Sequence, residues 1–146
     1  MAFTGTSISE ITIPASITSC DNELAGPFSG IPTLKKVIFE NGTTSIPSCI
    51  LAGGTVWQAM YVEDNVIPSS VISIGDYAFR GCNNFYKESL SLPKDLKKIG
   101  KSAFMACSSL KKIILPDALE SIGDACFAGC ISLEKIDIPA QLTTIP

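Results

Sequence analysis

Six cysteines are the residues of this sequence best suited to chemistry, because the 146-residue chain contains no histidine. Histidine is the commonest general base and the commonest metal ligand, so its absence lowers the expectation of an enzyme or a metal centre. Three of the cysteines, Cys82, Cys107 and Cys130, follow one another at intervals of 25 and 23 residues. If the chain repeats with that period, it stacks them in a column with neighbours about 4.8 Å apart.

A disulfide and a column of thiols both deserve consideration at that spacing. The Cα separation lies within the range of about 4.4–6.8 Å that disulfides use. Parallel side chains, however, keep their Cβ atoms about as far apart, beyond the mean of about 3.8 Å in disulfides. We therefore favour buried free thiols that act as small apolar side chains.

The other three cysteines also match structural positions. Cys126 replaces an alanine of the other repeats, Cys20 falls at an isoleucine position, and Cys49 lies in an irregular repeat. A zinc site requires close cysteine pairs, usually completed by further cysteine or histidine. Cys126 and Cys130 form such a pair, and no histidine is present to complete it. The sequence predicts no metal and no cofactor.

No enzymatic motif accompanies the cysteines. The chain lacks G-x-S-x-G, the P-loop and G-x-G-x-x-G, so we expect no catalytic residues and no enzyme. A net charge of −3 argues against a nucleic-acid partner. No apolar run reaches the roughly 18 residues of a membrane span, so membrane insertion is not expected, and residues 1–5 show no signal peptide.

The cysteines are positioned by an internal repeat, clearest in residues 96–118 and 119–141. Both follow Leu-x-x-Ile-Gly-x-x-Ala-Phe-x-x-Cys-x-x-Leu-x-x-Ile-x-Ile-Pro, with Cys126 in place of alanine and Leu115 in place of the last isoleucine. A period of 20–29 residues is typical of a leucine-rich-repeat solenoid. We predict one domain, 1–146, of about six coils. Their boundaries are 1–16 (partial), 17–42, 43–70 (irregular), 71–95, 96–118, 119–141 and a remnant at 142–146.

Each coil is expected to contain one strand and one return segment. In the strand, Ile113 and Leu115 should face inward while Lys112 and Ile114 face outward, and Pro116 should end it. In the return segment the glycine should permit a bend, the alanine should leave room and the phenylalanine should fill the coil. Phe79, Phe104 and Phe127 should then stack. The fold class is a horseshoe-like, right-handed solenoid, mostly β with short turns or 3₁₀ segments and little or no α-helix.

The three copies Ile74-Gly75…Cys82, Ile99-Gly100…Cys107 and Ile122-Gly123…Cys130, each followed by an Ile-x-Ile-Pro-like strand, resemble the BspA-like leucine-rich-repeat family. The match is close over 71–146 and loose over 1–70. The resemblance implies a curved domain without catalysis in cell-surface or secreted proteins. It also implies adhesion, with host matrix glycoproteins among the ligands.

Outward strand positions are the candidate binding surface, because the strands of a solenoid line its usual binding face. In register they begin with Glu10 and Thr12. The candidate site residues are Lys36, Ile38, Ser89, Ser91, Lys112, Ile114, Lys135 and Asp137. A solvated surface explains the same pattern, since outward positions must be polar somewhere. Trp57 and Tyr61 are a second candidate anchor, and Trp57 also fits a leucine core position.

Charge divides the chain into blocks. Residues 87–112 carry seven lysines against two acids, whereas residues 113–146 and 1–86 are each net negative. A basic band between acidic flanks favours an acidic ligand, although solvated lysines need no ligand. We expect a non-catalytic module that binds a protein or a glycan. The alternative is a structural spacer whose coils stack end to end, with edge-to-edge self-association.

Overall fold

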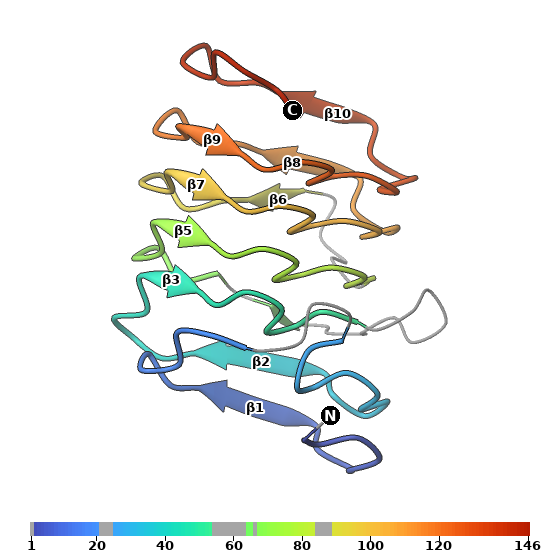
Figure 1. Cartoon of the computed structure of the whole chain (residues 1–146). Coiled ribbons are helices and arrows are strands. Elements are labelled where there is room, and N and C mark those ends of the chain that lie inside the picture. The colour runs from blue at the N-terminus through green and yellow to red at the C-terminus, as the bar shows by residue number, and fades with distance from the viewer. Residues whose placement is uncertain (1, 21–24, 54–63, 66, 84–88) are drawn as a thin grey trace.

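The computed structural model describes residues 2–20, 25–53, 64–65, 67–83 and 89–146, which wind into a β-solenoid (Figure 1). No helix occurs in these residues. The strands are β1 Glu10–Ile13, β2 Lys36–Phe39, β3 Ser45–Ile46, β4 Asp64–Asn65, β5 Ser73–Ile74, β6 Leu90–Ser91, β7 Lys98–Ile99, β8 Lys112–Ile114, β9 Ser121–Ile122 and β10 Lys135–Asp137.

All strand pairs are parallel and form three sheets. One face of the coil carries β1-β2-β4 and β6-β8-β10, and the return segments carry β3-β5-β7-β9. In Figure 1 the two sets of arrows point in opposite directions across the stack, because each coil passes once through each face. The predicted repeat solenoid is confirmed. The two-residue strands of the return segment were not predicted as a sheet, and the segments that follow them are turns.

The predicted alternation of the strands is confirmed in β8. Ile113 is 1% exposed and Leu115 is 6% exposed, whereas Ile114 between them is 43% exposed. The register places Leu90 and Ile136, which are half-buried, on either side of Ile113. Inward side chains therefore stack coil on coil. Fully burying one such side chain contributes about 1.5–3 kcal/mol.

The phenylalanines form the predicted stack through the middle of the coils. The ring centroids of Phe79 and Phe104 lie 5.2 Å apart with planes 8° from parallel. Phe104 and Phe127 lie 5.8 Å apart at 12°. A similar pair, Phe3 and Phe28, occurs near the N-terminus at 5.3 Å. Coil spacing is thus set partly by the thickness of aromatic rings in offset contact.

The glycine of the return segment has a different role from the one predicted. Gly75, Gly100 and Gly123 do not adopt positive φ, so glycine is not needed there to make a bend. A Cβ atom on Gly100 would lie 2.5 Å from the backbone nitrogen of Asp76 and 2.6 Å from the carbonyl carbon of Gly75. Glycine is required because two coils touch backbone to backbone at this position.

The bend itself falls two residues later, on residues that are not glycine. Cys49, Tyr77, Ser102 and Ala125 occupy this equivalent position with φ between 51° and 59°. The backbone hydrogen bonds explain the conformation. The Gly100 N–H donates back to Ile74 of the previous coil at 2.8 Å, whereas the Ser102 N–H donates forward to Asp124 of the next coil at 2.9 Å. The left-handed φ at Ser102 goes with a backbone N–H that points to the next coil, two residues after one that points to the previous coil.

Candidate functional site

The sheet β6-β8-β10 brings together six of the predicted site residues. Ser91, Ile114 and Asp137 form one outward row across the three strands. Lys112 and Lys135 lie directly opposite each other in the parallel row beside it. Backbone hydrogen bonds between strands fix this arrangement, so the side chains start from positions set by the strand spacing of about 4.8 Å.

A shallow hollow of about 470 Å³ lies at the start of these strands. Its lining residues are Ser89, Lys111, Lys112, Glu134 and Lys135. Ser89, Lys112 and Lys135 were predicted as site residues from their outward positions. Lys111 and Glu134 were missed because they precede the strands, although the lysine-rich block 87–112 already contained Lys111.

The hollow carries more positive than negative charge. Lys135 makes an ion pair with Asp137 at 3.2 Å within its own strand. Within the described part of the chain, Lys111 and Lys112 have no ion-pair partner. The backbone carbonyl of Lys111 accepts a hydrogen bond from the Glu134 N–H at 2.9 Å, which joins the two coils under the hollow.

Lys36 and Ile38 do not join this face. They lie on β2, whose hydrogen-bonded neighbours are β1 and β4, and no pairing between this sheet and β6-β8-β10 occurs among the described residues. Lys36 pairs with Glu10 at 3.2 Å, and Ile38 is half-buried beside Thr12. These residues border a separate hollow of about 670 Å³. In the described strands the predicted site residues therefore lie in two groups.

The second candidate anchor falls outside the described residues, because Trp57 and Tyr61 lie in the segment 54–63. The candidate site is therefore built from β6, β8 and β10 alone.

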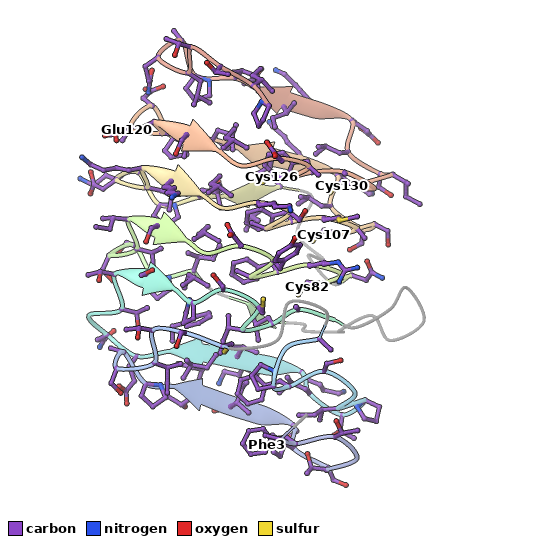
Figure 2. All side chains as sticks on the ribbon, viewed as in Figure 1. Phe3, Cys82, Cys107, Glu120, Cys126 and Cys130 are labelled. Carbon is purple, nitrogen blue, oxygen red and sulfur yellow. The ribbon has the colours of Figure 1, made fainter. Side chains whose placement is uncertain are left out.

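The cysteine column is buried, and all six cysteines are free thiols. Figure 2 shows Cys82, Cys107 and Cys130 above one another along the stack. Each thiol donates to a backbone carbonyl of the preceding coil, at 3.1–3.3 Å. For Cys107 the acceptor is Phe79 at 3.2 Å. Free buried thiols were predicted, but the hydrogen bond shows that cysteine is more than a small apolar side chain here.

Burial makes three of the thiols poor nucleophiles: desolvation raises the pKa of Cys82 to about 12 and that of Cys126 to about 12, and it raises the pKa of Cys107 as well. Cys130 differs, because its hydrogen bond with the Cys107 side chain lowers its pKa. A thiol reacts and binds metal as the thiolate. Among the described residues no group of three Cys, Asp or Glu side chains is arranged to hold a metal ion, and no helix is long and apolar enough to cross a membrane.

The repeats of this chain match a known protein family. The family model described as "BspA type Leucine rich repeat region (6 copies)" matches residues 1–87 and 53–146, which together span the chain. The chain belongs to this BspA-type leucine-rich-repeat family. The family assignment confirms the resemblance carried by the Ile-Gly…Ala-Phe…Cys repeats.

Two solved structures of leucine-rich-repeat proteins have a similar fold. A leucine-rich repeat protein from Bacteroides ovatus is 26% identical with a TM-score of 0.62, over 92% of this chain and 38% of that one. A leucine rich cell surface protein from Faecalibacterium prausnitzii is 23% identical with a TM-score of 0.53, over 93% and 49%. The chain thus spans less than half of either. No curated protein shows significant sequence similarity.

Proposed function

We propose that this chain is a non-catalytic recognition module that presents the β6-β8-β10 face to a protein or glycan ligand. The observation that carries the proposal is Ile114. It is 43% exposed in the middle of the strand face, between Ser91 and Asp137, beside a polar hollow. A half-exposed isoleucine flanked by polar side chains at fixed spacing suits a contact surface.

Rigidity supports binding by this face. Its residues lie on strands whose backbones are hydrogen-bonded across coils, so a ligand would order few groups when it binds. Relatives of this fold include a protein described as a leucine rich cell surface protein. We place the module outside the cell or on its surface, where a host matrix glycoprotein is one candidate ligand.

The test is capture of immobilised matrix glycoproteins by the purified chain and by a Lys112→Glu, Ile114→Ser variant. Saturable binding that the variant loses, with an unchanged melting temperature, is the expected result. A matched control is Lys98→Glu with Ile72→Ser. Lys98 lies on β7, and Ile72, beside β5, is 46% exposed, so the control makes the same chemical changes away from the proposed face. Equal loss in both variants would refute the site.

A structural spacer is the second candidate, and the regular pairing of β3, β5, β7 and β9 favours it. Each of these strands pairs in parallel with its neighbour at the same repeat position, so the coils stack as equivalent units. Ile138, which is 42% exposed, is an apolar side chain available for such stacking. The spacer proposal predicts that sedimentation shows concentration-dependent association, reduced by Ile138→Ser. A monomer at all concentrations, together with saturable ligand capture, would rule against it.

A further inference from the structure

The lysines of the hollow differ from two other charged pairs between adjacent coils. In the described residues Glu10 pairs with Lys36, and Lys97 pairs with Glu120, each at 3.2 Å, so opposite charges meet there. Lys112 and Lys135 are also register partners on adjacent coils, but both are cations. Like charges directly opposite each other on strands are destabilising.

Nearby acids only partly offset this repulsion. Asp137 is engaged with Lys135 at 3.2 Å, and Glu134 is the one acid that lines the hollow among the described residues. Lys111 adds a third ammonium group. The described residues of the hollow therefore supply three cations and one carboxylate, and two of these cations have no ion-pair partner in the described chain. An anion bound between them would relieve the repulsion.

We propose that this hollow binds an anionic polysaccharide, a glycan that carries sulfate or carboxylate groups. The inference rests on the proposed binding function and names the ligand class for that same face. Lysines act as point charges on flexible stems, which suits anionic groups spaced along a polymer. Ser89 in the hollow and Ser91 beside it add hydroxyls that can exchange hydrogen bonds with sugar hydroxyls.

The surroundings of the hollow favour a glycan over an acidic protein. Protein interfaces concentrate energy in Trp, Tyr and Arg. None of these is among the described residues that line the hollow, nor in the row Ser91, Ile114 and Asp137. β8 is paired on both sides, so it offers no free edge to which an extended peptide could add as a strand. At β8, which carries Lys112, recognition is therefore left to side-chain cations and hydroxyls.

Electrostatic attraction by the net charge of the whole chain cannot account for polyanion binding. The net charge of −3 repels a polyanion at long range. Any polyanion binding at physiological salt therefore depends on a local cluster. Exposed charges are screened beyond about 8 Å at that ionic strength.

The test measures binding of the intact chain to four polymers by calorimetry: dextran sulfate, carboxymethyl dextran, neutral dextran and poly-glutamate. We expect saturable, salt-sensitive binding to a charged dextran, with neutral dextran and poly-glutamate much weaker. Preference between the two charged dextrans identifies sulfate or carboxylate as the group recognised. Poly-glutamate bound as tightly as the better charged dextran would overturn the glycan assignment.

Variants locate the site. Lys111→Gln with Lys112→Gln removes the two unpaired cations without breaking an ion pair, and should weaken binding by about tenfold or more. Lys94→Gln with Lys98→Gln makes the same charge change elsewhere and should leave binding within about twofold. Equal weakening by both pairs would overturn the proposal, as would no binding to either charged dextran. Matrix glycoprotein capture that depends on Ile114 without charged-dextran binding would overturn the ligand class alone and leave the proposed function standing.

Discussion

The thiol of Cys107 donates a hydrogen bond to the carbonyl oxygen of Phe79, one coil earlier, across 3.2 Å. The same carbonyl also accepts the backbone N–H of Cys82 at 3.0 Å. The carbonyl oxygen of Phe79 thus accepts two hydrogen bonds, one within its own coil and one from the thiol of the next coil. Cys130 repeats the contact with Phe104 at 3.1 Å.

Substitutions of Cys107 separate this hydrogen bond from apolar packing. Cys107→Ala removes both and should lower the free energy of unfolding by about 1–3 kcal/mol in urea denaturation. Cys107→Ser keeps a donor for the Phe79 carbonyl and should lower it less than alanine does. If packing alone mattered, the buried hydroxyl would make serine the worse replacement. A serine variant less stable than the alanine variant would contradict the prediction.

The buried thiols should make stability fall in alkali. Desolvation raises the pKa of Cys82 from 9.0 to about 12. The thiol ionises at lower pH in the unfolded chain than in the folded one. The contribution of Cys82 to folding stability is therefore complete below about pH 9 and is lost as pH rises toward 12. Melting temperatures between pH 7 and 10 should decline above pH 9. The decline should be shallower in Cys82→Ala, which lacks this thiol, and an unchanged slope would contradict the assignment.

Gly100→Ala should force two coils apart. The added Cβ would meet the backbone nitrogen of Asp76 at 2.5 Å, and backbone atoms cannot rotate away as a side chain can. We expect a loss of about 1–3 kcal/mol in the free energy of unfolding. The reciprocal control is Ala106→Gly. Ala106 has φ 59°, and Gly81 and Gly129 occupy the equivalent position, so this change should be neutral or stabilising.

Phe104 should be the most sensitive ring of the stack. It lies between Phe79 and Phe127, at 5.2 and 5.8 Å, and is fully buried. Phe104→Ala should cost about 3–5 kcal/mol. Phe3→Ala is the comparison, because Phe3 stacks on one ring alone and is 38% exposed. Similar losses of unfolding free energy for both variants would show that the stack does not carry the coil contacts.

Periodicity alone determined the solenoid, the direction of most strand side chains and the stacking of Phe79 on Phe104. The reason is burial: a coil cannot remove its own apolar residues from water, so identical positions must meet on the next coil. The small-residue position of Cys126 followed for the same reason, since Ala78 and Ala103 at that position are fully buried.

Tertiary contacts decided what the sequence left open. The role of Gly100 depends on how closely two backbones approach. The hydrogen bond of Cys107 depends on which carbonyl of the preceding coil lies within reach of its thiol. Neither distance is encoded in the spacing of residue types. The placing of Lys36 and Lys112 in different sheets of the described residues likewise depends on which strands pair. Repeats specify which positions face outward, whereas the stacking of unequal coils decides which outward side chains share one surface.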